Sequence, residues 1–275
     1  MQNPYNSLAT PCGSSCGSAI SAAANLATVT LGTETDGSIL CPSSFNSVVG
    51  IKPTNGLTSR AGVVPISLRQ DTVGPICRTV SDAAHVLDVI AGIDRNDVAT
   101  TEASRYIPMG GYAQFLRRDG LRGKQIGIVR ALFNITGQTS LTPIYEKHFN
   151  TLRKGGAVLV DNLEIPHFDE IYSDRRNTEK AALLNLARFA KDDYVNLVTK
   201  NKLDAVVAPL QNVSPLLAIS GSPGVVVPAG YDDGVPVGLS FGGLRGWEPR
   251  LIEMAYGFEQ STKIRKPPSL KKLKF

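Results

Sequence analysis

Short apolar runs alternate along the chain with longer segments whose hydrophobic positions recur at helical spacing. The order is clearest after residue 124, where the apolar run Gln125–Val129 predicts a buried strand. An amphipathic helix then begins at Thr142 and ends at Lys154, and Ala157–Val160 predicts the return strand. A strand, a crossover helix and a second strand in this order predict a βαβ unit.

The rest of the chain after residue 76 continues this alternation, without an internal repeat or a clear linker. A capping sequence over 79–82 begins another helix, and residues 93–111 are typical of a polar loop. The other predicted elements are a helix over about Thr178–Asn201, strands over Asp204–Ala208, Val225–Val227 and Val237–Phe241, and a final helix over Pro249–Gln260. We therefore expect one α/β domain over residues 1–262, with a mixed, twisted β-sheet covered by helices.

The first 76 residues have a different character, because they are rich in Gly, Ser, Ala and Pro and carry little charge before Lys52. Residues 14–27 predict a helix of small side chains, which can approach its neighbours closely and which we expect to be buried. A short strand over Thr28–Leu31 leads into the tight segment Gly32–Ser38. This region therefore places many small polar groups in a dry setting.

Composition and charge exclude some classes of protein. With 42% hydrophobic and 19% charged residues, the 275-residue chain is not a fully disordered protein. The net charge of +5 depends on residues 263–275, whose six Lys and Arg leave the rest of the chain at −1. We expect this segment to be a solvated basic tail, without a nucleic-acid or membrane partner. The chain has neither a long apolar run nor a signal pattern, so we expect a cytoplasmic location.

The cysteines do not predict a metal site. Cys12, Cys16, Cys41 and Cys77 are too few for a disulfide scaffold, and the spacing of the first two lacks the second ligand pair of a structural zinc site. We expect small buried thiols and no bound metal.

Two serine-containing turns, 24 residues apart, are the candidate reactive site. Ser14 and Ser15 lie in a G-x-S-x-G pattern, but no apolar strand precedes it, so a hydrolase nucleophile elbow at Ser15 is not favoured. Ser38 ends a glycine-containing turn whose successive backbone N–H groups can point at one oxygen, which is the arrangement of an oxyanion hole. A serine nucleophile also needs a base, and no histidine lies near either turn in the sequence.

At these residues the chain resembles the amidase signature family. The free-standing amidases of that family are a closer match than its amidotransferase members, because the pattern TETDGSI-x-CP is present without an appendage for tRNA. The matching segments are 13–17, 32–42 (GTETDGSILCP), 50–56 (GIKPTNG), 71–78 (DTVGPICR), 205–209, 223–230 (PGVVVPAG), 236–240 and 249–260.

The resemblance implies a catalytic role for several residues. Ser38 matches the nucleophile that forms the acyl-enzyme, and Ser14 matches the bridging serine that follows a cis peptide bond. The backbone N–H groups of Thr35, Asp36, Gly37 and Ser38 match the oxyanion hole. The family's base is a neutral lysine, and the chemistry needs no metal and no cofactor.

Three departures from the family pattern change this expectation. The catalytic lysine of the family lies before the serine turns, whereas the first lysine here is Lys52, which matches a packing element. We therefore expect an N-terminally truncated member without a catalytic lysine, whose sheet keeps an unpaired edge. A helical stretch of the family is shortened at 168–175, so part of the acyl pocket wall is missing. Leu40 and Cys41 stand where relatives carry an arginine, which favours a neutral carboxamide substrate over a carboxylate.

Three functions remain open at this point. The first is an amidase that hydrolyses small neutral carboxamides, alone or as a homo-oligomer. The second is a non-catalytic pseudoenzyme or fragment, which the missing lysine favours. The third is the glutaminase component of a tRNA-dependent amidotransferase, which the near-neutral body of the chain disfavours.

Overall fold

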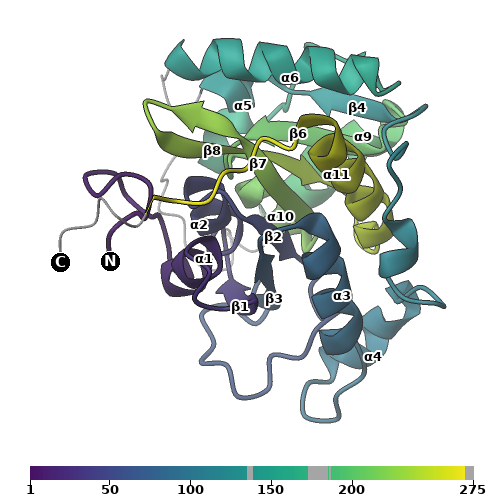
Figure 1. Cartoon of the computed structure of the whole chain (residues 1–275). Coiled ribbons are helices and arrows are strands. Elements are labelled where there is room, and N and C mark those ends of the chain that lie inside the picture. The colour runs from purple at the N-terminus through teal and green to yellow at the C-terminus, as the bar shows by residue number, and fades with distance from the viewer. Residues whose placement is uncertain (135–138, 173–184, 186, 270–275) are drawn as a thin grey trace.

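A computed structural model describes residues 1–134, 139–172, 185 and 187–269. In these residues, eight strands form one mixed sheet in the order β1-β3-β2-β7-β8-β6-β4-β5 (Figure 1). Strands β4, β5 and β6 pair in parallel, and every other pair is antiparallel. The strands are β1 (Val29–Glu34), β2 (Val49–Lys52), β3 (Thr72–Cys77), β4 (Gln125–Ile128), β5 (Val158–Val160), β6 (Ala205–Pro209), β7 (Gly224–Asp232) and β8 (Val235–Gly242).

Helices cover both faces of this sheet. The α-helices are α1 (Cys16–Ala23), α2 (Leu40–Phe45), α3 (Val80–Ile90), α4 (Ala99–Ala103), α5 (Arg130–Asn134), α6 (Thr142–Lys154), α7 (Phe168–Tyr172), α9 (Asn196–Lys200), α10 (Ser214–Ser220) and α11 (Glu248–Thr262). Short 3-10 helices are η1 (Ser104–Tyr106), η2 (Ala113–Phe115) and η3 (Thr139–Leu141), and η4 (Phe189–Val195) is a π-helix.

Strand β6 shows how the layers are separated. Its alternate residues Ala205 and Val207 belong to the core under α3, α6 and α11, whereas Val206 and Ala208 belong to a second core under α9, α10 and η4. All five residues of β6 are buried, because successive side chains of a strand point to opposite faces and both faces are covered. The molecule is therefore a three-layer α/β/α arrangement (Figure 1).

The predicted fold class is confirmed, and so is the βαβ unit, whose strands β4 and β5 pair in parallel. Thr79 caps α3 as expected, because its side chain accepts a hydrogen bond from the Asp82 N–H at 3.0 Å. The prediction of a plain loop over 93–111 was wrong, since this segment contains α4 and η1. Part of the predicted helix over 178–201 lies outside the described residues, and its described end is η4 followed by α9.

The small residues near the N-terminus allow the close packing that the sequence predicts. Ala19, Ala22 and Ala23 bury one face of α1 against Ile39 and Ile76. A Cβ atom on Gly32 of β1 would lie only 2.9 Å from the Ser15 hydroxyl oxygen, so this crossing requires glycine. The packing places the start of α1 directly against β1.

Strand β1 is one edge of the sheet. Two of its apolar side chains, Val29 and Leu31, are exposed. In the described part of the chain, no helix has the length and apolar character needed to span a membrane.

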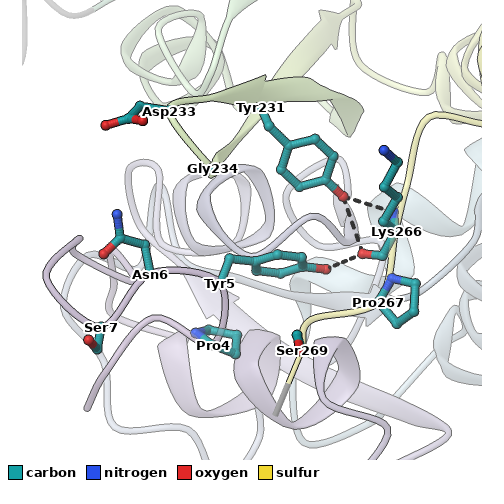
Figure 2. A pocket seen from close by; sticks show the side chains of 10 residues that line it. All are labelled: Pro4, Tyr5, Asn6, Ser7, Tyr231, Asp233, Gly234, Lys266, Pro267 and Ser269. Carbon is teal, nitrogen blue, oxygen red and sulfur yellow. Dashed lines mark hydrogen bonds between the residues drawn. The ribbon is translucent and has the colours of Figure 1, made fainter. Parts of the chain in front are cut away.

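The basic C-terminal segment is held against the fold at its beginning. Tyr5 and Tyr231 both donate hydroxyl hydrogen bonds to the Lys266 carbonyl, at 2.7 and 3.2 Å, and Arg265 donates to the Ser47 carbonyl at 2.9 Å. A pocket of about 530 Å³ lies between these ends of the chain (Figure 2). The first residues of this segment are therefore anchored and not free in solvent.

Candidate active site

The turn between β1 and α2 presents Ser38 at the edge of the sheet. We call residues 35–38 the serine loop. Gly37 has a φ of +78°, and a Cβ atom there would lie 3.2 Å from the Ser214 hydroxyl oxygen, so glycine meets both a conformational and a spatial requirement. The Gly37 carbonyl then accepts the first helical hydrogen bond from the Cys41 N–H at 2.7 Å. The loop thus ends as helix α2 begins.

The backbone of the serine loop has free donors. Within the described chain, the N–H groups of Thr35, Asp36 and Ser38 have no hydrogen-bond acceptor. The Gly37 N–H, also a predicted oxyanion donor, interacts with the Glu34 carboxyl group. Free N–H groups in one tight turn are the donors that an oxyanion requires. The role of this turn as an oxyanion hole stays a prediction.

The Ser14 turn contacts the serine loop directly. The Gly13–Ser14 peptide bond is cis, as the resemblance implies. The N–H of the next residue, Ser15, donates to the Ser38 carbonyl at 3.2 Å. Ser14 itself is exposed and lines a cavity of about 450 Å³ with Gly32 and Thr33. The fold therefore brings together the two serines that lie 24 residues apart in the sequence.

Ser15 links the start of α1 to β1 through its hydroxyl group. Its hydroxyl donates to the Thr33 carbonyl at 3.0 Å and accepts from the Thr33 N–H at 3.1 Å. The Ser14 and Ser38 hydroxyls, by contrast, have no hydrogen-bond partner among the described residues. These two hydroxyls are therefore the ones available to a substrate.

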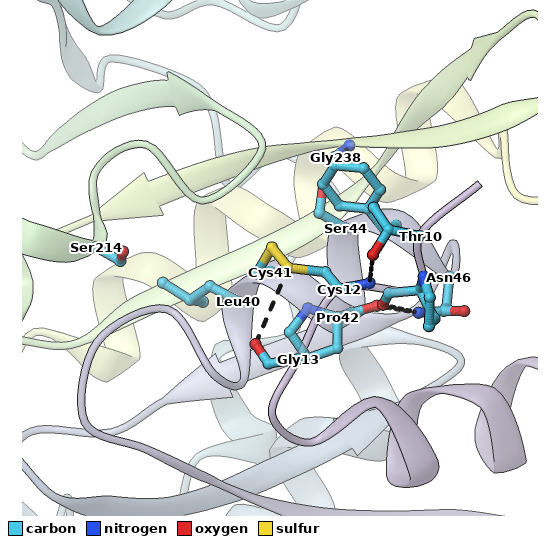
Figure 3. Close-up of a disulfide and its surroundings, with 12 residues drawn as sticks. Thr10, Cys12, Gly13, Leu40, Cys41, Pro42, Ser44, Asn46, Ser214 and Gly238 are labelled. Carbon is cyan, nitrogen blue, oxygen red and sulfur yellow. Dashed lines mark hydrogen bonds between the residues drawn. A yellow bond between two sulfur atoms is a disulfide. The ribbon is translucent and has the colours of Figure 1, made fainter. Parts of the chain in front are cut away.

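A disulfide joins the two serine turns, and it corrects the expectation of four free thiols. Cys12 and Cys41 are bonded across 29 residues, with their Cα atoms 5.8 Å apart (Figure 3). Cys12 precedes the cis bond, and Cys41 lies in the first turn of α2. Cys77 is a buried thiol as expected, and Cys16 is half-buried. Spacing alone does not predict the pairing, because the two cysteines approach only when the turns meet.

Two side chains of the serine loop are anchored to distant parts of the fold. The Thr35 hydroxyl donates to Asp71 at 2.5 Å, and the other Asp71 oxygen accepts the N–H groups of Ile66 and Ser67. Asp36 accepts a 2.7 Å hydrogen bond from the Ser214 hydroxyl at the start of α10. Asp71 lies within a segment matched to the family, but its partner Thr35 could not be inferred from sequence spacing.

A buried charge cluster, Glu34, Lys52 and Glu248, lies beneath the loop. Lys52 is fully buried, and its Nζ donates to Asn55 Oδ1 at 3.1 Å and to the carbonyls of Ser222 and Pro53 at 2.9 and 3.4 Å. Burial lowers the pKa of Lys52 to about 8, and the carboxylates of Glu34 and Glu248 oppose that change. Lys52 has no hydrogen bond to Ser14 or Ser38 in the described structure.

The three histidines make their contacts away from the two serine turns. His85 lies on exposed α3 surface, His148 donates from Nε2 to the Ala229 carbonyl, and His167 contacts Asp193. Within the described residues, no group of three or more His, Cys, Asp or Glu side chains could hold a metal ion. The candidate site therefore consists of two serines and backbone donors.

Known proteins share both this fold and the sequence around the two serine turns. The profile of the amidase family matches residues 1–214 of this chain. The chain belongs to the amidase family. It is 45% identical to a protein of Arabidopsis thaliana named probable amidase, over 97% of this chain and 63% of that protein. The fold is similar to the native peptide amidase of Stenotrophomonas maltophilia, with a TM-score of 0.85 and 35% identity over 98% of this chain and 69% of that one.

Other amidase-family proteins are more distant. A glutamyl-tRNA(Gln) amidotransferase component from Clostridium botulinum is 28% identical over 96% of this chain and 70% of its own length. This chain thus spans less than two thirds of the Arabidopsis relative and about 70% of the bacterial one.

The Arabidopsis alignment also bears on the expected gap in the acyl pocket wall. It extends over 332 residues, more than the 275 of this chain, so that relative contains internal residues that this chain lacks. The predicted site of the shortening, 168–175, is described only as far as the end of α7 at Tyr172, and the rest lies outside the described residues.

Proposed function

We propose that this chain is a serine amidase that cleaves the carbon–nitrogen bond of neutral carboxamides through an acyl-enzyme on Ser38. The observation that carries the proposal is the contact between the Ser14 turn and the serine loop, where the Ser15 N–H donates to the Ser38 carbonyl at 3.2 Å beside backbone N–H groups that have no described acceptor. Membership of the amidase family supports the same reaction.

In the proposed reaction, Ser38 Oγ attacks the amide carbonyl carbon and the carbonyl oxygen becomes an oxyanion. The N–H groups of Thr35, Asp36 and Ser38 stabilise that charge, and each such donor contributes about 3–4 kcal/mol in serine hydrolases. The Ser14 hydroxyl takes the Ser38 proton while it gives its own proton to the departing nitrogen. The amine leaves, and an ester of Ser38 remains.

Water completes the cycle. It attacks the ester carbonyl carbon, its proton returns through Ser14 to Ser38 Oγ, and the carboxylic acid is released. The net change is hydrolysis of one amide to an acid and an amine. None of these steps requires a cofactor.

The surroundings of Ser38 support a neutral substrate. Leu40 and Cys41, the first residues of α2, are buried and uncharged. Asp36 is exposed beside Ser38 and carries a carboxylate that would repel an anionic substrate. A small neutral carboxamide therefore fits the local charge better than a carboxylate does.

A non-catalytic role is the second candidate, and one observation favours it. Residues 1–51 contain no lysine, and the donors of Lys52 are all engaged with neutral oxygens. A hydroxyl without a base is a poor nucleophile, so such a chain would keep the loops as part of its core. The glutaminase alternative has less support, since identity to the Clostridium protein is 28% against 45% to the Arabidopsis protein.

Hydrolysis of a panel of neutral aryl and aliphatic amides tests the proposal, with Ser38→Ala as the matched control. We expect amine release from the wild-type chain and none from the variant. A folded, monodisperse wild-type protein that releases no amine would instead favour the non-catalytic role. Inclusion of glutamine in the panel tests the glutaminase alternative.

A further inference from the structure

The side chain of Glu34 connects the two ends of the serine loop. Glu34 is the last residue of β1, directly before the loop, and only 1% of it is exposed. Its Oε2 accepts the N–H groups of Ile39 at 2.6 Å and Leu40 at 2.9 Å, directly after the loop. One carboxylate therefore spans the four residues that carry the proposed nucleophile and oxyanion donors.

We infer that Glu34 is a positioning residue that holds the serine loop in its reactive conformation through the two N–H groups that its carboxyl group accepts directly after the loop. The catalytic part of this inference rests on the proposed function, whereas the structural part, that the carboxylate holds the loop, does not. Hydrogen bonds to a charged acceptor contribute more to stability than those between neutral groups. A carboxylate is thus suited to fix a turn that contains glycine.

The electrostatic surroundings act on the Glu34 carboxyl group in opposite directions. The Glu34 Oε1 atom is buried without a hydrogen-bond partner among the described residues. Burial raises the pKa of Glu34, and the positive charge of Lys52 and the N–H groups of Leu40, Ile39 and Gly37 oppose that rise. Desolvation is the larger effect, so the role of Glu34 rests on the two N–H groups that its Oε2 accepts.

The same lysine serves a second buried carboxylate, which provides a matched control. Glu248 is fully buried at the start of α11, and its Oε1 accepts the Thr54 N–H at 2.5 Å. Its Oε2 is also buried without a partner in the described chain. Glu248 therefore shares the burial and counter-charge of Glu34, but it binds a different loop.

The anchors differ in how firmly they hold the serine loop. Thr35 and Asp36 are each held by one hydroxyl hydrogen bond, to Asp71 and from Ser214. Glu34 instead accepts two backbone N–H groups directly after the loop, and the first of them belongs to Ile39, the residue next to Ser38. Loss of that carboxyl group should therefore affect the loop more than loss of either hydroxyl.

Hydrogen exchange and the reactivity of Ser38 test the inference in wild type, Glu34→Gln, Glu34→Asp and Glu248→Gln. In the wild type, the Ile39 and Leu40 amides should exchange slowly, although they begin a helix and lack an intrahelical acceptor. Glu34→Gln should make the exchange of these two amides about tenfold faster. It should also make the labelling of Ser38 by a fluorophosphonate about tenfold slower, and each change corresponds to about 1.4 kcal/mol. Glu34→Asp, which keeps the carboxyl group, should restore part of the amide protection and part of the labelling rate.

Glu248→Gln should lower the melting temperature. In the folded protein, the exchange of the Ile39 and Leu40 amides and the labelling rate of Ser38 should stay within about twofold of the wild-type values. Unprotected Ile39 and Leu40 amides in the wild type would overturn the inference, even if no Glu34 variant folded. Equal effects of Glu34→Gln and Glu248→Gln would overturn it as well, since both would then act through general stability. A wild-type Ser38 that is not labelled, with the exchange pattern intact, would contradict the proposed function and leave the role of Glu34 in the loop in place.

Discussion

The serine region, residues 1–78, and the parallel region, residues 125–209, are stabilised in different ways. Among the described residues, twelve buried polar or charged side chains lie in the serine region and two lie in the parallel region. The parallel region is held by apolar contacts around residues such as Phe149, whereas the serine region is held by buried carboxylates, hydroxyl groups and a disulfide. The comparison indicates that hydrophobic packing supports the fold and directional hydrogen bonds set the site.

The sharpest expected contrast is at Ser38. Ser38→Ala should lower amide turnover by at least about 1,000-fold, because loss of a nucleophile removes the covalent route. Its melting temperature should stay close to that of the wild type, since the hydroxyl has no described hydrogen-bond partner. Steady-state assays measure the turnover, and thermal unfolding of the same samples measures the melting temperature. Residual turnover near the wild-type level would show that another group attacks the amide.

Phe149→Ala should give the opposite result, a loss of stability without a change at the site. Phe149 is 1% exposed and contacts the Phe133 ring edge-on, with centroids 5.2 Å apart. Truncation should lower the free energy of unfolding by about 3–5 kcal/mol through lost burial and a cavity. Urea unfolding measures this loss, and fluorophosphonate labelling of the folded fraction should remain at the wild-type rate. Slower labelling would mean that the two regions are coupled.

Opening the Cys12–Cys41 disulfide should destabilise the serine region. In the chain-entropy description, a bond that closes 29 residues contributes about 3–4 kcal/mol. The Cys12→Ser and Cys41→Ser double variant should lose stability of this order, and hydrogen exchange should rise around Ser14 and Ser38. The α6–β5 segment should exchange as in the wild type. A uniform rise over both regions would contradict the regional assignment.

A smaller, pH-dependent effect is expected in the parallel region. His148 is 1% exposed, and burial lowers its pKa, with the Ala229 carbonyl opposing and Lys147 adding to the decrease. The unfolded chain therefore binds a proton near pH 6.5 that the folded chain does not, so stability falls as the pH drops below about 6.5, by at most about 1.4 kcal/mol per pH unit. Urea unfolding of wild type and His148→Gln between about pH 7 and pH 5 should show a shallower slope for the variant. Parallel slopes would contradict the assignment to His148.

Sequence reasoning was most successful where periodicity is regular. The βαβ unit, α3, α11 and the β7–β8 pair follow from apolar spacing and capping residues. It missed β2 and β3 as strands, because their residues are almost all buried and lack the alternation that marks a half-exposed strand. It also missed α10, a short apolar helix.

The site was predicted only in part. The two serine turns and the cis bond followed from a family resemblance, and the structure brings the turns together. Glu34 was missed, because the predicted strand ended at Leu31 and Glu34 fell in the predicted tight segment, whereas β1 extends to Glu34. Its counter-charge Lys52 and the partner Glu248 come from β2 and α11. Contacts among residues so far apart in the chain are set by tertiary packing, which local patterns do not encode.

The most direct test of the central claim is the identity of the residue that reacts with a fluorophosphonate. The folded wild-type chain would be treated with the probe, digested and mapped by mass spectrometry, beside Ser38→Ala. The account predicts one adduct, on Ser38, which is absent from the variant. An adduct on Ser14 or Ser15, or no adduct on a folded wild-type protein, would contradict it.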